Sequence, residues 1–407
     1  MKILIVNAVN ALLSTGEFAF EISEFINKKQ NDECYIAYSV GPDSERAFKI
    51  TNKYECLFHG LMSRAFGMQG YFSPFATNRL ISWIKKEKPD VVHLNNLHAN
   101  YLNVKQLLLF LGKNDIPTVV TMHDCWDYTG KCTHYSSIGC NKWQTGCNSC
   151  PKLKSDHKSW FLDMTKLMWE DKNQAFNSIE RLAVIGVSDW ITDEVRKSPM
   201  FKNAKIIKRI YNWVDYDKYS SKNKSDIDVR KKYNIGNRKI ILGVASNWTN
   251  NKGLDKFEKL SREIGDEYVV VLVGNGELIK VNDKLINIPR IDSTPELVSI
   301  YCESEVLMQL SMQETFGKVV AEAMSCGLPI ITNNSTANPE LVDSNCGIVL
   351  NELKTDKMIE AISQIGQHRE DYSKNCRETV KQRFCKEELI GEYYNTFKEI
   401  TFEKQGI

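Results

Sequence analysis

Two glutamates in the last third of the chain are spaced to hold a hydroxyl-rich ligand beside a phosphate. Glu314 and Glu322 are separated by seven residues and lie on either side of the start of a short predicted helix. Gly317 stands at the helix entrance, where the absence of a side chain lets a ligand approach the backbone and where free N–H groups attract phosphate. Gly327 and Pro329 end the helix. A diphosphate linked to two hydroxyl-rich rings would fit this anion site.

Two further loops in the same half follow predicted strands. After strand 240–245, a polar loop leads to Lys252 at a helix entrance, where its ammonium could neutralise a diphosphate. The alternative is a solvated surface lysine. Gly274 and Gly276 follow strand 268–273 and permit close approach to a ring or phosphate, although many α/β turns use Gly-x-Gly only to turn. Ligands bind outside the carboxyl ends of strands in open α/β sheets, so these loops are candidate phosphate sites.

The first half carries similar signals after its own strands. Ser14 or Thr15 could cap the first helix with Gly16 at its start, and a plain capped turn is the alternative. His123 follows the predicted strand 118–122 and can donate or accept a hydrogen bond near neutral pH. It could equally be a hydrogen-bonded core histidine.

These blocks together resemble the retaining glycosyltransferases of family 4, which have the GT-B fold. The resemblance spans roughly residues 1–350 and rests on several blocks together. They are the Glu-x7-Glu element with Phe316-Gly317 and Cys326-Gly327-Leu328-Pro329, Thr121-x-His123-Asp124, the run from Pro89 to His98, and Asn212-Trp213-Val214-Asp215. In that family the first glutamate contacts the transferred sugar and the second contacts the ribose of the nucleotide. The resemblance assigns these roles to Glu314 and Glu322.

The resemblance implies a full set of site residues. The expected catalytic residues are His123, Lys252 and Glu314, and the expected acceptor-side residues are Asn95, His98 and Asp124. The expected donor-binding residues are Gly16, Asn247, Gly274, Gly276, Phe316, Gly317, Lys318 and Glu322. Two positions depart from the family pattern. Asn247 stands where the family has an arginine, so one fixed positive charge is missing, and Arg290 and Lys318 are the candidates to supply it. Trp213 stands where the family has a glycine.

Five cysteines crowd the segment 125–151, and four of them suggest a metal site. Cys147-Asn148-Ser149-Cys150 is a Cys-x2-Cys knuckle, and Cys132 and Cys140 could supply two more thiolates. Four thiolates suit a closed structural zinc site. Reduced thiols and disulfides are the alternatives, with disulfides disfavoured in a cytoplasmic protein. Catalysis itself is expected to need no metal or other cofactor, as the resemblance implies.

The bulk properties indicate a two-domain α/β protein. The 407 residues suffice for two domains, and the net charge of +2 gives no reason to expect nucleic acid as a partner. No apolar stretch is long enough to span a membrane, and the apolar run at the N-terminus is too short to be the core of a signal peptide. A cytoplasmic location is therefore expected. Strand-length apolar runs alternate with helical periods, which predicts parallel sheets covered by helices. The predicted strands of the first half are 3–6, 34–38, 91–94, 118–122 and 183–187.

The expected organisation is two Rossmann-like domains facing across a cleft, the GT-B fold. An acceptor-side domain is expected over 1–215, a linker over 216–238 and a nucleotide-sugar domain over 239–385. The resemblance implies that an amphipathic helix within 386–407 returns to the first domain.

The expected reaction moves a sugar from a UDP- or GDP-sugar to a hydroxyl, with retention at the anomeric carbon. The resemblance implies that the acceptor is a glycan or lipid-linked oligosaccharide of a bacterial capsule, exopolysaccharide or O-antigen (lipopolysaccharide). It also implies that the enzyme meets this acceptor by peripheral contact at the inner face of the cytoplasmic membrane. A sugar-nucleotide epimerase and a non-catalytic sugar-nucleotide-binding protein are the alternatives. Asn247 and Trp213 favour the second of these.

Overall fold

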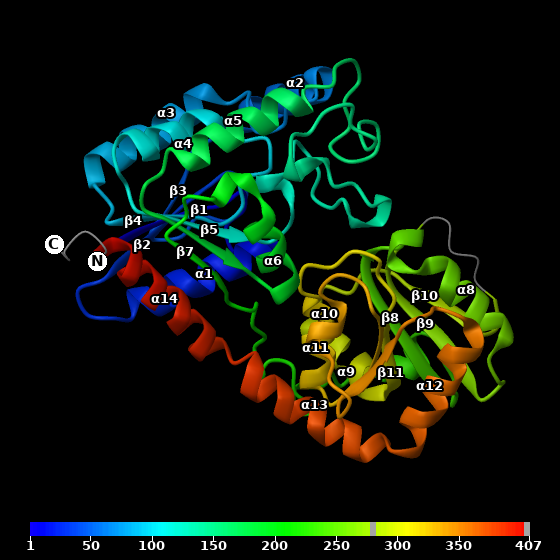
Figure 1. Cartoon of the computed structure of the whole chain (residues 1–407). Coiled ribbons are helices and arrows are strands. Elements are labelled where there is room, and N and C mark those ends of the chain that lie inside the picture. The colour runs from blue at the N-terminus through cyan, green and yellow to red at the C-terminus, as the bar shows by residue number, and fades with distance from the viewer. Residues whose placement is uncertain (277–281, 403–407) are drawn as a thin grey trace. The chain divides into compact units, whose positions relative to one another are not determined.

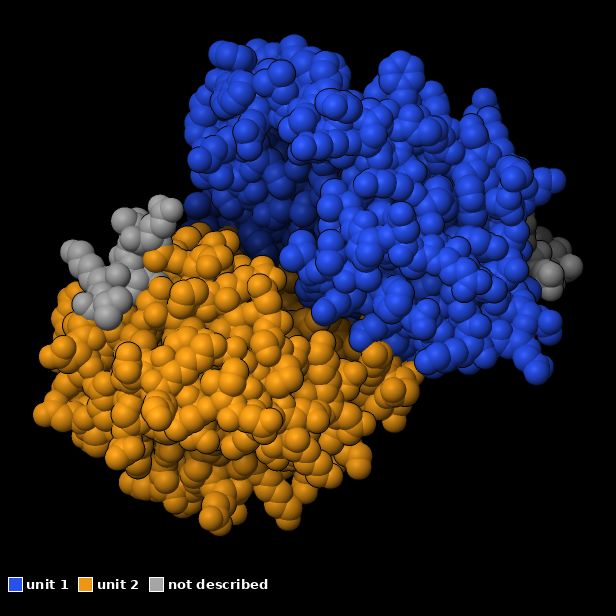
Figure 2. Space-filling model, turned by 180° about the vertical axis from the view of Figure 1, so that it is seen from behind, with its two compact units in different colours: residues 1–210, 390–407 blue, residues 211–389 orange. Residues whose placement is uncertain are grey.

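The computed structural model describes residues 1–276 and 282–402, and the chain forms two compact units. Figure 2 colours them separately. The first unit holds Met1–Ile210 and the chain from Ile390 onward, and the second holds Tyr211–Leu389. The segment 216–238, expected as a linker, therefore falls inside the second unit. Among the described helices, none combines the length and apolar character needed to cross a membrane.

The first unit is a seven-stranded parallel sheet in the order β3-β2-β1-β4-β5-β6-β7. Figure 1 shows α3, α4 and α5 along one face, and α1 and α14 along the other. The strands are β1 (Lys2–Val6), β2 (Glu33–Tyr38), β3 (Ala47–Lys49), β4 (Val91–Leu94), β5 (Thr118–Met122), β6 (Leu182–Gly186) and β7 (Ile206–Arg209). The helices are α1 (Leu13–Asn27), α2 (Lys53–Phe66), α3 (Pro74–Glu87), α4 (Val104–Lys113), α5 (Thr165–Asn177), α6 (Asp189–Lys197) and α14 (Lys386–Phe402), with 3-10 turns η1 (Trp126–Tyr128), η2 (Ser136–Ile138), η3 (Lys142–Gln144) and η4 (Pro199–Phe201).

The second unit is a six-stranded parallel sheet in the order β10-β9-β8-β11-β12-β13. Its strands are β8 (Lys239–Asn247), β9 (Tyr268–Asn275), β10 (Leu285–Ile288), β11 (Ser304–Gln309), β12 (Ile330–Asn333) and β13 (Gly347–Leu350). Its helices are α7 (Val229–Lys232), α8 (Leu254–Glu263), α9 (Thr294–Glu303), α10 (Lys318–Ser325), α11 (Asn338–Leu341), α12 (Thr355–Gln367) and α13 (Arg369–Arg383), with 3-10 turns η5 (Ser221–Asn223) and η6 (Asn250–Lys252).

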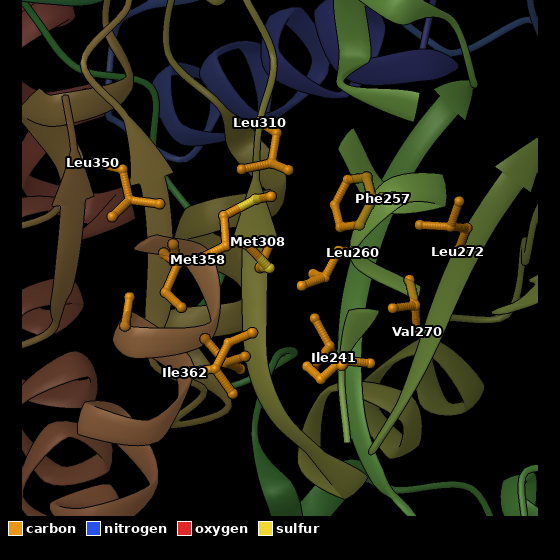
Figure 3. Packing of buried hydrophobic residues seen from close by; sticks show 14 of the residues in the cluster. Ile241, Phe257, Leu260, Val270, Leu272, Met308, Leu310, Leu350, Met358 and Ile362 are labelled. Atoms are coloured by element: carbon orange, nitrogen blue, oxygen red, sulfur yellow. The ribbon is translucent and has the colours of Figure 1, made fainter. Parts of the chain in front are cut away.

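The core of the second unit forms where α8 and α12 cover one face of its sheet. Phe257 and Leu260 of α8 and Met358 of α12 pack against Met308 of β11, and all four side chains are buried. Figure 3 shows these side chains converging between the helices and the strands. A parallel sheet covered on both faces needs strands that are apolar on both sides, which explains the continuous apolar runs in the sequence.

The C-terminal helix α14 supplies part of the first unit's core. The buried ring of Tyr393 lies edge-on to Phe18 of α1 at a centroid distance of 5.3 Å and 5.8 Å from His93 of β4. Thr121 Oγ1 donates a hydrogen bond to the Tyr393 hydroxyl oxygen at 3.4 Å. The last long helix of the chain is thus packed against elements formed by the first third of the sequence.

Candidate functional site

A lysine and a glutamate from separate loops form an ion pair in the second unit. Lys252 ends η6, which follows β8, and Glu314 lies in the loop after β11. Lys252 Nζ donates a hydrogen bond to Glu314 Oε1, and Gln309 Nε2 donates to the same oxygen at 3.3 Å. Strands β8 and β11 are neighbours at the point where the strand order of the sheet reverses, which is where open α/β sheets bind ligands.

The loop that carries Glu314 is held by a polar turn after β12. The backbone N–H of Glu314 donates to Thr336 Oγ1 at 2.9 Å, and the N–H of Ala337 donates to the Glu314 carbonyl at 3.2 Å. The buried Asn338 side chain donates to the Ser311 carbonyl at 2.7 Å. These bonds fix the Glu314 backbone before any ligand arrives.

The entrance of α10 has the conformation that a glycine permits. Gly317 is the N-cap of α10 with φ 89°, a left-handed geometry that residues with a Cβ adopt only under strain. No side chain caps the first turn, which is an arrangement that favours an anion at a helix entrance, and Lys318 opens the helix. The N–H of Val320 donates to the Gly317 carbonyl at 2.9 Å. Phe316 faces inward instead, because its ring contacts Phe384 edge-on at 5.4 Å. Phe316 is therefore placed in an aromatic cluster.

Glu322 is buried on α10 beside a tyrosine from α9. The hydroxyl of Tyr301 donates to Glu322 Oε2 at 3.3 Å, and burial raises the pKa of Tyr301 well above its ordinary value. Tyr301 therefore stays protonated and orients one carboxylate oxygen of Glu322.

The Gly-x-Gly loop has a packing reason for its first glycine. A Cβ at Gly274 would lie 1.9 Å from the carbonyl oxygen of Ala245, and Gly274 has φ 136°. Only glycine allows β9 to approach the end of β8 this closely. Gly276 directly follows β9, and Asn247 is the exposed last residue of β8, in register with Asn275.

Asn95, predicted on the acceptor side, and His123, predicted as catalytic, form a hydrogen-bonded network with Asn7 in the first unit. Asn7, Asn95 and His123 directly follow β1, β4 and β5, three adjacent strands of the sheet. Asn95 Nδ2 donates to Asn7 Oδ1 and to the carbonyl of Thr15, each at 3.1 Å. His123 Nε2 lies 2.9 Å from Asn95 Oδ1.

This network fixes the tautomer of His123. A backbone carbonyl can only accept, so the Asn95 atom facing Thr15 is the amide nitrogen and the opposite atom is the oxygen. His123 Nε2 must therefore carry the proton that Asn95 Oδ1 accepts. Burial lowers the pKa of His123 to about 4, so the ring is neutral at neutral pH.

His98 and Asp124 form an ion pair beside this network. His98 Nε2 lies 2.7 Å from Asp124 Oδ2. Burial alone would raise the pKa of Asp124, but the charge of His98 and its hydrogen bond lower it to about 2. Burial alone would lower the pKa of His98, and the charge of Asp124 raises it instead. Both groups are therefore charged at mildly acidic pH.

The glycine loop of the first unit differs from the expectation. Helix α1 begins at Leu13, its N-cap is Leu12, and no side chain caps it. Ser14 and Thr15 are therefore helical residues rather than caps, and Gly16 is the fourth residue of the helix. A Cβ at Gly16 would lie 3.0 Å from Val9 Cγ2, so this glycine lets the preceding loop pack against the helix.

The four cysteines predicted to hold zinc line one small pocket of about 20 Å³. The N–H of Gly130 donates to Cys147 Sγ at 3.1 Å, and a hydrogen bond from Cys132 lowers the pKa of Cys150 to about 7. In the described part of the chain, however, no group of three or more His, Cys, Asp or Glu side chains is placed to hold a metal ion. The predicted zinc site is therefore not found. All twelve cysteines are free thiols.

The predicted site residues thus fall into one set per unit. Lys252, Glu314 and the entrance of α10 belong to the second unit, and the His123 network belongs to the first. Sequence reasoning missed Asn7, Thr336 and Asn338, which hold predicted residues in place. Their positions in the sequence could have identified them, because each residue lies in or just after the turn that follows a strand.

Two protein-family models match most of the chain. Residues 28–218 match the model described as Glycosyltransferase Family 4, and residues 225–383 match the model described as Glycosyl transferases group 1. The chain is 23% identical over 337 residues to an uncharacterized 41.2 kDa protein in the cps region of Klebsiella pneumoniae, covering 78% of this chain and 81% of that protein. It is 28% identical over 199 residues to the O-antigen biosynthesis glycosyltransferase WclY of Escherichia coli, covering 47% of this chain and 55% of WclY.

The fold matches solved structures over nearly the whole chain. The crystal structure of HepE from Anabaena in complex with UDP superposes with a TM-score of 0.66 at 13% identity, covering 98% of this chain and 100% of HepE. The expected GT-B fold is thereby confirmed. The chain belongs to the group 1, or family 4, glycosyltransferases. It is a retaining enzyme that uses a nucleotide sugar as donor.

Proposed function

We propose that this enzyme transfers a hexose from a UDP- or GDP-sugar to a hydroxyl of a lipid-linked oligosaccharide. The product would be a capsule, exopolysaccharide or O-antigen unit, built at the inner face of the cytoplasmic membrane. The similarity to WclY and to a cps-region protein supports this choice of acceptor. The HepE structure, solved with UDP, supports a uridine nucleotide as the first donor to test.

The observation that carries the proposal is the ion pair between Lys252 and Glu314. The two residues are 62 positions apart and come from different loops, yet the fold brings them into contact at the switch point of the second sheet. A sugar diphosphate needs both groups, because its phosphates require positive charge and its sugar hydroxyls require acceptors. The pair therefore marks where the sugar and the diphosphate would meet.

In the proposed reaction the bond from the anomeric carbon to the β-phosphate oxygen breaks. The bond from that carbon to the acceptor oxygen forms on the same face, and the acceptor proton passes to the leaving diphosphate. Lys252 and the N–H groups at the entrance of α10 stabilise the charge that develops on the diphosphate. Glu314 orients the sugar through its hydroxyls, and Glu322 binds the ribose. The proposed reaction requires no metal.

The first unit would hold the acceptor side. His123 is neutral with its proton on Nε2, so it acts as a hydrogen-bonding group rather than as a cation. The His98–Asp124 pair fixes the adjacent loop with two charges. Both features suit the orientation of sugar hydroxyls, which is the role that we assign to His123, Asn95, His98 and Asp124.

A donor screen with purified enzyme tests the proposal. UDP-, GDP-, ADP- and dTDP-hexoses are compared for hydrolysis in water and for transfer to lipid-linked oligosaccharide. We expect one nucleotide series to be turned over with release of the nucleoside diphosphate, and Glu314→Gln to lower that turnover about 100-fold. Release of an epimerised sugar nucleotide, or turnover that Glu314→Gln leaves unchanged, would overturn the proposal. Lys256→Ala, a substitution on the exposed side of α8, serves as the control.

A further inference from the structure

Helix α2 exposes apolar side chains and buries polar ones. Its ends are well defined, since Asn52 and Glu55 form a reciprocal capping box and Gly67 ends the helix in a left-handed conformation. The residues buried on it are His59 and Ser63. The large apolar side chains that it exposes by more than half are Tyr54, Leu57, Phe58 and Leu61. This inverts the usual amphipathic pattern, in which the apolar stripe faces the core.

A neighbouring loop extends the apolar surface. Trp160, Phe161 and Leu162 are all exposed, with Phe161 exposed by 76%. The N–H of Trp160 donates to the carbonyl of Arg64 at 2.6 Å, which fastens this loop to the last turn of α2. We call the seven side chains of Tyr54, Leu57, Phe58, Leu61, Trp160, Phe161 and Leu162 the α2–loop surface. Figure 1 shows α2 at one end of the first unit.

A basic pocket of about 520 Å³ lies between α2 and the same loop. Arg64 and Lys158 line it beside His157, whose pKa is lowered to about 4 by burial, and among the described residues that line it none is an Asp or Glu. The hydroxyl of Ser63, which is more than nine-tenths buried, and the side-chain oxygen of Gln69 also line it and have no hydrogen-bond partner. The pocket therefore offers positive charge and unsatisfied polar atoms beside the apolar surface.

Three carboxylates near the pocket already have partners of their own. Asp156 lies 3.9 Å from His157 Nε2, and it accepts hydrogen bonds from the N–H of Thr133 at 3.0 Å and from Lys152 Nζ at 3.2 Å. Glu55 receives hydrogen bonds from the N–H of Asn52 and from Arg79. Asp163, which follows Leu162, accepts from the N–H of Cys150 at 2.6 Å and from the N–H of Thr165 at 3.0 Å. The occupant of this surface must therefore be apolar at its centre and negative at its edge.

We propose that the α2–loop surface docks on a bilayer of anionic phospholipids, with Arg64 and Lys158 contacting lipid phosphates. Exposed Tyr and Trp beside aliphatic side chains, flanked by basic residues, are the chemistry of a helix lying in a membrane interface. A second copy of the chain fits less well, because a two-fold contact would bring the same basic groups together. The proposal deepens the proposed function and rests on it for the choice of a membrane as partner.

Sedimentation with vesicles tests the docking directly and needs no nucleotide sugar. Full-length enzyme is mixed with vesicles of phosphatidylcholine containing about one third phosphatidylglycerol, and with pure phosphatidylcholine vesicles. The double variant Phe58→Gln/Leu61→Gln is compared with Val40→Gln/Ile227→Gln, which removes exposed apolar side chains elsewhere. We expect the first variant to bind anionic vesicles about tenfold more weakly, and the control to bind as the wild type does.

A second pair of substitutions tests the charged edge. Arg64→Gln/Lys158→Gln is expected to lose the preference for anionic over neutral vesicles, by about tenfold, and to bind with a weaker salt dependence. Wild-type enzyme that does not sediment with anionic vesicles, or variants that all bind equally, would overturn the docking. Light scattering could also overturn the docking, if it shows that the wild type is a dimer and that Phe58→Gln/Leu61→Gln is a monomer. The partner of the α2–loop surface would then be a second copy of the chain.

Donor hydrolysis separates this test from that of the proposed function. All of these variants are expected to hydrolyse the donor at the wild-type rate in the absence of vesicles, because the substitutions lie outside the second unit or on its exposed surface. Vesicle binding without donor turnover would contradict the proposed function alone. Donor turnover without vesicle binding would contradict the docking alone.

Discussion

Lys252 and Glu314 show how two single residues form a candidate site that neither forms alone. Each could have been an ordinary surface charge, and their contact depends on the pairing of β8 with β11. The sequence predicted both residues because each stands at a loop between a strand and a helix. It could not predict their mutual contact, because strand order and register depend on the whole sheet.

Replacement of Lys252 should affect turnover more than donor affinity. Lys252→Ala removes a charge that matters most when the diphosphate leaves, so kcat is expected to fall about 100- to 1,000-fold with a small change in KM. Lys252→Arg keeps the charge and should retain more activity. Steady-state kinetics with the preferred donor measure both. If kcat/KM falls because KM rises while kcat stays unchanged, Lys252 contributes to substrate binding and not specifically to stabilisation of the transition state.

The His98–Asp124 pair should make stability depend on pH in a defined window. The lowered pKa of Asp124 stabilises the fold above about pH 4, and this contribution is lost as the pH falls toward 2. The raised pKa of His98 stabilises the fold below about pH 6.5, and this contribution is lost as the pH rises through the folded value. The pair therefore contributes most between these limits.

Comparison of the wild type with Asp124→Asn measures this contribution. In urea unfolding, the variant is expected to be about 2 kcal/mol less stable between pH 4 and 6.5, with a smaller difference on either side. A difference that stays constant from pH 3 to 9 would show that the two groups do not pair as charges. Asp193→Asn, on the exposed face of α6, is the matched control.

At the scale of elements, the central strands were predictable and the edges were not. Strands β4 and β5 are buried on both faces, so their apolar runs match the observed bounds. The short outer strands β3 and β7 carry half-buried or exposed residues and gave no comparable signal. The start of α1 was misjudged because its N-cap is Leu12, which no capping rule identifies.

Two glycines at candidate donor loops should differ when replaced by alanine. Gly274→Ala places a Cβ against the Ala245 carbonyl, so a loss of about 2 kcal/mol or more is expected. At Gly317 the atom nearest to an added Cβ would be 3.6 Å away, which is an ordinary contact. Gly317→Ala is therefore expected to lose about 1 kcal/mol of stability, because alanine is strained in the left-handed backbone conformation. Thermal unfolding ranks the two variants. Gly391→Ala, with open space inside α14, should be neutral or stabilising, and equal losses at Gly274 and Gly317 would contradict the packing argument.

At the scale of the whole molecule, the chain returns to its first unit through α14. Tyr393 lies against Phe18 and His93, which connects the C-terminal helix to the strands that carry the His123 network. The amphipathic pattern of this segment predicted a helix. Where it packs was an implication of the resemblance to family 4, because periodicity alone does not identify the partner of a helix.

Truncation of Tyr393 should therefore destabilise the first unit. Tyr393→Ala leaves a cavity between α14 and the sheet, and a loss of about 3–5 kcal/mol is expected. Tyr393→Phe keeps the ring and loses the 3.4 Å hydrogen bond from Thr121, so about 1 kcal/mol or less is expected. Hydrogen exchange of β4 and β5 amides reports the effect locally. Unchanged protection in Tyr393→Ala would show that α14 does not support these strands.

The central claim is that the second unit binds the donor through Glu314 and Glu322, and a thermal-shift comparison tests it most directly. Wild type, Glu314→Gln and Glu322→Gln are each titrated with UDP-, GDP-, ADP- and dTDP-sugars. The account predicts that one nucleotide series stabilises the wild type and that both variants lose most of this stabilisation. If no nucleotide sugar stabilises the wild type, or if both variants respond as the wild type does, the donor site has been misplaced.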